Sequence, residues 1–296
     1  MRFEVTILGN GSASPAADRH QTAHVLNVRE QFYLIDCGES IRARLVGAGV
    51  SPLKIRAIFI SHIHGDHIYG LMPLISSLGL AGKQTPLKVF GPPAIRKLID
   101  FFQNEFGTPV AFEIDFTPVD PTRHAHVYEN RSMEVWSIPL RHRVPTTGYL
   151  FREKPDPHNH PTRSYGYLSD TSPSPKAAGL VRGVDLMYHE ATFAHTDRRL
   201  ERDTGHSTAT EAARIALKAE AGELLIGHFS SRYKDLGLLE AEAQAIFPNT
   251  HIAREGATFS VPLRKADSPP KTDSPRKAEP VCEADISHQT DNATEI

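Results

Sequence analysis

The chain has few cysteines and no long apolar run, and both absences narrow the classes of protein it can belong to. It contains two cysteines in 296 residues, Cys37 and Cys282. A disulfide scaffold and a cysteine-based zinc site are therefore disfavoured, and a reducing cytoplasm is the simplest setting. No run of about 18 consecutive apolar residues occurs, so we expect no membrane-spanning helix. The N-terminal segment, residues 1–7, has the composition of a strand and not of a signal peptide.

The chain also lacks a strong charge of either sign. Its 33 Lys and Arg residues are balanced by 35 Asp and Glu residues, which gives a net charge of −2. Attraction to a polyanion would therefore have to come from a local patch and from metal cations. The segment Gly9–Gly11 opens like a dinucleotide loop, but Ser14 stands where a further glycine would be needed. No Walker-type lysine motif is present either, so we expect no nucleotide cofactor.

Apolar and β-branched runs alternate with segments of helical periodicity, which favours a mixed α/β (α+β) fold with long antiparallel stretches. We expect one domain over residues 1–263. Large apolar residues are nearly absent beyond it, so residues 264–296 are predicted to be a disordered tail. The predicted strands lie at residues 3–8, 24–28, 31–35, 55–60, 87–90, 110–116, 133–139, 148–151, 164–169, 185–189, 223–227, 251–253 and 258–261, and the predicted helices at 40–47, 68–80, 93–103, 209–221 and 236–246.

The most informative feature is a dense group of three imidazoles and one carboxylate directly after the predicted strand at residues 55–60: His62, His64, Asp66 and His67. Alternation along an extended segment puts His62 and His64 on one side. A glycine then lets the backbone turn, so that Asp66 and His67 can face a second point nearby. Imidazole and carboxylate are the ligands that zinc and its neighbours take without thiolate. The run predicts part of a two-metal site; the alternative is a helix cap flanked by surface histidines.

Three further side chains, each at a strand end or in a polar turn, could complete the ligand set: His142, Asp170 and His228. Taken alone, each is more typical of a solvated or hydrogen-bonded residue than of a ligand. Taken together, they allow two complete sites. We expect His62, His64 and His142 on one ion, Asp66, His67 and His228 on the other, and Asp170 between them.

These motifs resemble those of the metallo-β-lactamase superfamily and, within it, of the ribonuclease Z family, which processes the 3′ ends of transfer RNA. The resemblance extends over roughly residues 3–261. The metal motif alone indicates only the superfamily, whereas three others are more specific: His189-Glu-Ala-Thr-Phe193, Gly205-His-Ser-Thr208 and His228-Phe-Ser-Ser-Arg-Tyr233. The resemblance implies a four-layer αβ/βα sandwich, two Zn²⁺ per chain and often a homodimer.

The same resemblance assigns catalytic roles. His206, supported by Glu190, is expected to protonate the departing 3′ oxygen, and Asp66 to orient or deprotonate the attacking water. The alternative for Glu190 and His206 is a purely structural contact. Ser231 and Arg232 could bind phosphate, although an exposed salt bridge is an equal possibility for Arg232.

The resemblance has one departure. Many members of the family carry a long arm that grips the elbow of transfer RNA, inserted between the motifs of His142 and Asp170. Here residues 152–164 form only a short proline-rich link. We expect cleavage of 3′ trailers from precursor transfer RNA. Hydrolysis of small phosphodiesters or other esters is the alternative that the short link favours, and an RNA- or protein-binding subunit with a degenerate metal site is a third possibility.

Overall fold

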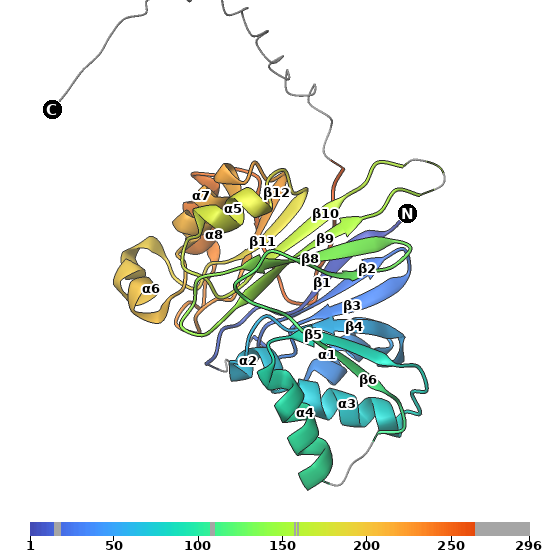
Figure 1. The fold of residues 1–296 in the computed structure, drawn as a ribbon. Coiled ribbons are helices and arrows are strands. Elements are labelled where there is room, and N and C mark those ends of the chain that lie inside the picture. Colours follow the sequence, from blue (N-terminus) through green and yellow to red (C-terminus); the bar gives the residue numbers. More distant parts are fainter. Residues whose placement is uncertain (15–18, 107–109, 157, 159, 264–296) are drawn as a thin grey trace, which may run out of the picture. The chain divides into compact units, whose positions relative to one another are not determined.

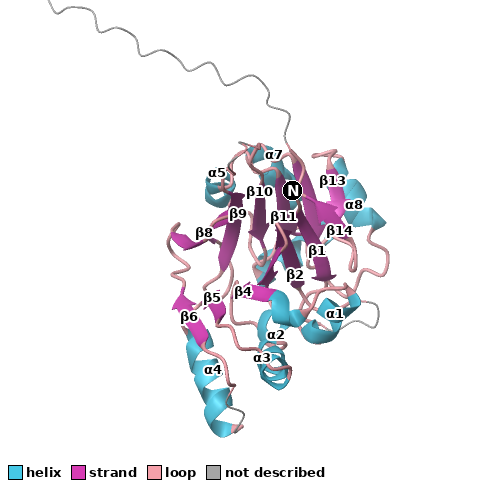
Figure 2. Ribbon diagram, turned by 90° about the vertical axis from the view of Figure 1, so that its right-hand side faces the viewer, coloured by secondary structure: helices cyan, strands magenta, loops and turns pink. Residues whose placement is uncertain are grey.

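The computed structural model describes residues 1–14, 19–106, 110–156, 158 and 160–263. Two seven-stranded sheets pack face to face, and helices cover the outer face of each (Figure 1; Figure 2). This arrangement confirms the predicted α/β class and the four-layer sandwich. The predicted disordered tail lies outside the described residues, and the domain boundary at residue 263 stays a prediction. No helix in the described part of the chain is long and apolar enough to cross a membrane.

The first sheet is antiparallel on one side and parallel on the other. Its strands β1, β2 and β14 pair antiparallel, whereas β3 to β6 run parallel to one another. In spatial order the strands are β14 (Thr258–Ser260), β1 (Phe3–Gly9), β2 (Ala23–Val28), β3 (Gln31–Ile35), β4 (Ile55–Phe59), β5 (Leu87–Gly91) and β6 (Ile114–Pro118).

The second sheet repeats this plan. Strands β10 to β13 run parallel, and β7 to β10 pair antiparallel. In spatial order the strands are β13 (Thr250–Ile252), β12 (Glu223–Gly227), β11 (Leu186–Glu190), β10 (Ser164–Leu168), β9 (Thr147–Glu153), β8 (Met133–Pro139) and β7 (His126–Glu129). Strands β9 and β10 are neighbours joined by residues 154–163, so the predicted short link is a plain connection between adjacent strands.

Alternation along the strands produces three layers of core. In β4, for example, Ala57 and Phe59 face the other sheet, whereas Ile58 faces the helices. Central strands such as β2 and β11 are therefore buried on both faces, whereas the edge strands β6, β7 and β14 are partly exposed. Burial on both faces explains the continuous apolar runs of the central strands. Helices α1 (Ile41–Gly47), α3 (Leu71–Leu80) and α4 (Ala94–Glu105) cover the first sheet, and α5 (Pro175–Leu180), α7 (Ala209–Lys218) and α8 (Gly237–Gln244) cover the second.

One predicted helix is divided in the structure. Residues 68–80 were expected to be continuous, but α2 (Gly65–Ile68) ends before α3 begins. The amide of Gly70 donates to the carbonyl of Cys37 at 2.8 Å, which diverts it from the helical ladder. A Cβ on Gly70 would lie 2.1 Å from the carbonyl oxygen of Gly38, so only glycine allows this close approach.

Other boundaries also differ. The strand expected at residues 110–116 is β6, which begins at Ile114. Strand β7, helix α5, helix α6 (Arg198–Thr204) and two short 3₁₀ helices, Pro52–Lys54 and His195–Asp197, were not predicted. All are short, and periodicity is a weak signal over so few residues. Helix α7 begins with a capping box, in which the side chains of Thr208 and Glu211 each bond the backbone amide of the other residue.

Candidate metal centre

All the predicted ligands except His142 lie at the carboxyl ends of strands that pair in parallel, where loops of α/β sheets commonly carry function. His62 and the residues that follow it leave the end of β4, Asp170 follows β10, and His228 follows β12. His142 lies in the turn between β8 and β9. The two sheets therefore contribute donors to one cluster.

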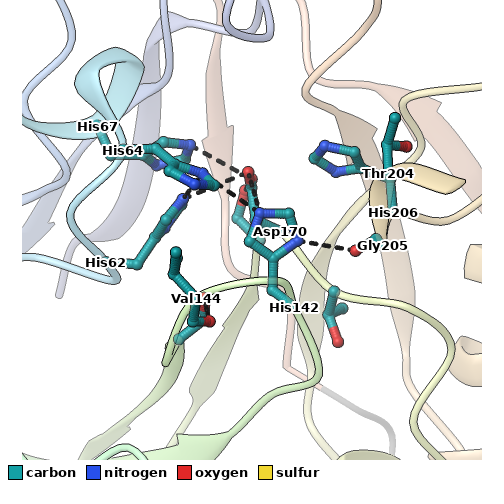
Figure 3. A network of polar contacts seen from close by, with 12 residues as sticks. His62, His64, His67, His142, Val144, Asp170, Thr204, Gly205 and His206 are labelled. Carbon is teal, nitrogen blue, oxygen red and sulfur yellow. Dashed lines mark hydrogen bonds and ion pairs between the residues drawn. The ribbon is translucent and has the colours of Figure 1, made fainter.

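These donors form two sets that share one carboxylate. Oδ2 of Asp170 lies 3.5 Å from Nε2 of His62 and 3.8 Å from Nε2 of His142. Its other oxygen, Oδ1, lies 3.3 Å from Nε2 of His67 and 3.1 Å from Nε2 of His228. Figure 3 shows His62, His64 and His67 gathered beside the Asp170 carboxylate. Within each set the ligand atoms lie within 4.8 Å of one another. The first set consists of His62, His64, His142 and Asp170, and the second consists of Asp66, His67, Asp170 and His228.

The donor atoms fit a transition-metal ion. Nε2 of His67 is buried and faces the carboxylates of Asp66 and Asp170 at 3.4 and 3.3 Å, while its Nδ1 is occupied by Asp36. Burial, together with the charge of His67, holds the pKa of His62 well below its ordinary value, so this imidazole is neutral and can donate a lone pair. Neutral imidazole with carboxylate suits zinc and also manganese or iron. The roles of the individual residues as ligands stay predictions.

The backbone is strained at three residues of the cluster. Asp36, Asp170 and His228 have φ angles of 57°, 56° and 59°, in the left-handed region that residues with a side chain rarely adopt. Such conformations persist only where the surrounding structure holds them, and they concentrate at functional sites.

Asp36 fixes the orientation of a candidate ligand. Its Oδ2 accepts hydrogen bonds from Nδ1 of His67 at 2.7 Å, from Oγ of Ser61 at 2.8 Å and from the Tyr167 hydroxyl at 2.6 Å. Its Oδ1 accepts from the Ser61 amide at 2.7 Å. Asp36 therefore both orients a histidine and satisfies a local amide. Oγ of Ser61 also lies 2.9 Å from Nδ1 of His62. The Ser61 hydroxyl therefore contacts one candidate ligand, His62, directly and is connected to a second, His67, through Asp36.

Glu190, in the second sheet, likewise orients imidazole rings of the site. Its Oε1 accepts a hydrogen bond from Nδ1 of His206 at 2.8 Å, and its Oε2 accepts one from the Thr192 hydroxyl at 2.7 Å. The same hydroxyl lies 2.9 Å from Nδ1 of His228. One buried carboxylate is thus connected both to the predicted proton donor and to a predicted ligand.

The pairing of Glu190 with His206 changes both pKa values. Burial alone would raise the pKa of Glu190, but the charge and hydrogen bond of His206 lower it to about 2. Burial would likewise lower the pKa of His206, but Glu190 raises it to about 9. His206 therefore carries its proton at neutral pH, as a general acid requires. Its ring lies 4.9 Å from that of His142 and 5.2 Å from that of His228.

A cavity of about 500 Å³ opens onto the cluster. Arg143 and Arg232 line it, so cations stand beside the donors. The Arg232 guanidinium lies 5.3 Å from the centre of the Phe193 ring and 3.8 Å from Asp197. Arg232 therefore forms a salt bridge and also lines the cavity. Ser231 is exposed and is not part of the lining, whereas its neighbour Ser230 is.

Sequence reasoning missed four of the residues that support the cluster: Ser61, Tyr167, Thr192 and Arg143. Ser61 and Thr192 adjoin predicted site residues, which is a usable signal. Tyr167 lies on β10, and nothing in its local sequence indicates a bond to Asp36 from another sheet.

Known proteins resemble this chain over most of its length. A family model described as the beta-lactamase superfamily domain matches residues 32–229. A ribonuclease Z from Porphyromonas gingivalis is 40% identical, with 86% of this chain and 97% of that protein aligned. A ribonuclease Z from Bacteroides fragilis is 38% identical, with 88% and 99% aligned.

A solved structure is also similar to this chain. The crystal structure of human tRNase Z, short form, matches with a TM-score of 0.74 and 27% identity, covering 88% of this chain and 100% of that one. These matches confirm the resemblance that the motifs indicated. The chain belongs to the ribonuclease Z family of the β-lactamase superfamily.

Proposed function

We propose that the chain is a zinc-dependent endoribonuclease that removes 3′ trailers from precursor transfer RNA. The observation that carries this proposal is the Asp170 carboxylate, which turns one oxygen to each set of donors, with the His206–Glu190 pair directly beside them. A pair of zinc ions, when bound, would lower the pKa of a water molecule and neutralise the charge of the phosphate. The relatives named ribonuclease Z support the substrate class.

The chain's own residues would perform the remaining steps. Asp66, which lies 3.3 Å from His228, orients the attacking water and takes its proton as the water oxygen bonds to phosphorus. The bond between phosphorus and the 3′ oxygen breaks, and His206 gives its proton to that oxygen. Arg143 and Arg232 bind the phosphate oxygens. The products are a transfer RNA with a 3′ hydroxyl and a trailer with a 5′ phosphate.

The test is to incubate the zinc-loaded protein with a 3′-extended transfer RNA and to map both product ends. We expect release of the trailer as one fragment with a 5′ phosphate. A transfer RNA of the same sequence without a trailer serves as the control and should stay intact. Stepwise release of mononucleotides, or no cleavage, would contradict the proposal.

A second candidate is a hydrolase of small phosphodiesters or other esters. The short connection between β9 and β10 favours it, because this is where the family's RNA-gripping arm would be inserted. Rates on a small chromogenic phosphodiester and on the precursor RNA separate the two functions. We expect kcat/KM to be higher for the RNA.

The assembly and location of the protein belong to the same proposal. We propose a homodimer in the cytoplasm. The resemblance to the family supports the dimer, and the scarcity of cysteine supports the reducing compartment. Light scattering on the purified protein tests the first point, and fractionation of cells tests the second.

A further inference from the structure

An exposed aromatic side chain stands at the edge of the metal cavity. Tyr69 lines the cavity together with His64, Gly65 and Asp66, yet its side chain is 62% exposed. It follows α2, the short helix that begins in the candidate metal motif itself. A single exposed aromatic side chain is common on a protein surface, so it is the position of Tyr69 at the cavity, and not its exposure alone, that makes it a candidate contact for a substrate.

One side of the Tyr69 ring packs against the backbone. A Cβ built on Gly65 would lie 2.0 Å from Cζ and 2.5 Å from the hydroxyl of Tyr69, which means that the ring lies directly over the backbone of Gly65. A side chain at position 65 would displace the ring from this position. The ring therefore lies next to His64 and Asp66, within the segment that would carry the metal ligands.

The rest of the ring makes no polar or aromatic contact with the described part of the chain. Among the described residues, the Tyr69 side chain makes no hydrogen bond, ion pair or ring contact. Most other aromatic rings near the cavity are engaged: Phe193 lies under Arg232, and His206 bonds Glu190. Tyr69 thus offers an open aromatic surface beside the place where the phosphate would bind.

We propose that Tyr69 forms a nucleobase subsite, in which the base of a nucleotide flanking the scissile phosphate stacks on the open part of the ring. The inference rests on the proposed function, since it supplies a substrate contact for that reaction. Stacking on an aromatic ring accepts any base, so this subsite would hold RNA in position without reading its sequence. Such a contact matters more here than in family members with an arm, because the connection between β9 and β10 is short.

The experiment replaces Tyr69 with Leu and, as the conservative variant, with Phe. Loss of one stacked base lowers kcat/KM for the precursor RNA by about 5- to 100-fold in Tyr69→Leu, whereas Tyr69→Phe stays within about twofold of the wild type. Zinc content should be equal in all proteins. Phe101→Leu is the matched control, because Phe101 is 57% exposed on α4 and does not line the cavity; it should leave kcat/KM unchanged.

Abasic substrates separate stacking from a purely structural role. Two precursor RNAs each lack one base, either upstream or downstream of the cleavage site. For one of them, the kcat/KM of the wild-type protein should fall by the same factor. On that substrate Tyr69→Leu should cause no further loss. An equal effect of Tyr69→Leu on both abasic RNAs and on the intact RNA overturns the inference.

A fluorescence measurement decides the question independently of cleavage. The RNA carries 2-aminopurine at the flanking nucleotide that the abasic substrates identify, or at each flanking nucleotide in turn. Its fluorescence should be quenched on binding to the wild type and to Tyr69→Phe, but not on binding to Tyr69→Leu. Quenching without cleavage would contradict the proposed function and support the base subsite. Cleavage with equal quenching by all three proteins would leave the proposed function standing and overturn the subsite.

Discussion

Two buried carboxylates at the rear of the site hold the histidines in place, one from each sheet. Asp36 bonds His67 and, through Ser61, reaches His62. Glu190 bonds His206 and, through Thr192, reaches His228. In each case a hydroxyl group bonded to the carboxylate also contacts a second imidazole. A change to either carboxylate would therefore disturb the orientation of two imidazole rings.

Replacing Asp36 with Asn should weaken metal binding without unfolding the protein. The amide cannot accept the bonds of His67, Ser61 and Tyr167 together as a carboxylate does, and His67 would lose its fixed orientation. We expect zinc affinity to fall by about 10- to 100-fold, measured by competition with a chromogenic chelator. Unchanged affinity would show that Asp36 serves only the local amides.

Replacing His206 with Ala should remove turnover while the metal stays bound. His206 belongs to neither of the two donor sets that share Asp170, but it lies in position to deliver a proton. We expect kcat on the precursor RNA to fall by about 10²- to 10⁴-fold, with zinc content by metal analysis equal to that of the wild type. Full activity in this variant would contradict the role of proton donor.

At the scale of elements, sequence pattern predicts those that are long or regular and misses those set by partners elsewhere in the chain. The capping box of Thr208 and Glu211 marks the start of α7 because both groups are local. The break between α2 and α3 depends instead on the carbonyl of Cys37, which takes the amide of Gly70.

The same contrast applies to the site. Residue types and spacing were enough to select the seven candidate ligands, since zinc chemistry demands those side chains. The bond from Tyr167 to Asp36 could not be found in this way, because it joins two sheets across the core. Ser231 was selected for its motif, but the turn after β12 leaves it exposed and puts Ser230 at the cavity.

Helix α6 carries a buried carboxylate that makes stability depend on pH. Burial, and then the charge of Glu211, raise the pKa of Glu201 from 4.5 to about 7. Between these values the unfolded chain has lost the proton while the folded chain retains it, so this residue reduces stability as pH rises. Glu201→Gln should match the wild type near pH 4.5 and melt a few degrees higher at pH 8.

Thermal unfolding over this pH range, followed by circular dichroism, provides the measurement. Asp203→Asn is the matched control, because Asp203 lies on the same helix and is exposed. A gap between Glu201→Gln and the wild type that does not grow with pH would contradict the assigned cause.

At the scale of the whole molecule, the candidate ligands tie the two sheets together. His62, His64, Asp66 and His67 come from the first sheet, whereas His142, Asp170 and His228 come from the second. Ions bound here would therefore stabilise the packing of one half against the other, because they bind only when both halves are in place.

Removing the metal should lower the melting temperature of the entire fold. Zinc at about 1,000 times its dissociation constant stabilises a folded protein by about 4 kcal/mol, which corresponds to several degrees in a chain of this size. We expect a chelator to abolish that gain in the wild type and to have little effect on Asp170→Ala, as measured by differential scanning calorimetry. A melting temperature insensitive to the chelator would contradict a metal shared by the sheets.

The position of Asp170 has one more consequence. Because one carboxyl group faces both sets of donors, and because its backbone is held in a left-handed conformation, it has little freedom to serve either set separately. Whichever ion arrives first fixes the plane of that carboxylate and changes the field felt by the second. Stepwise loading should accordingly be cooperative in one direction or the other, and a titration should not follow two independent isotherms.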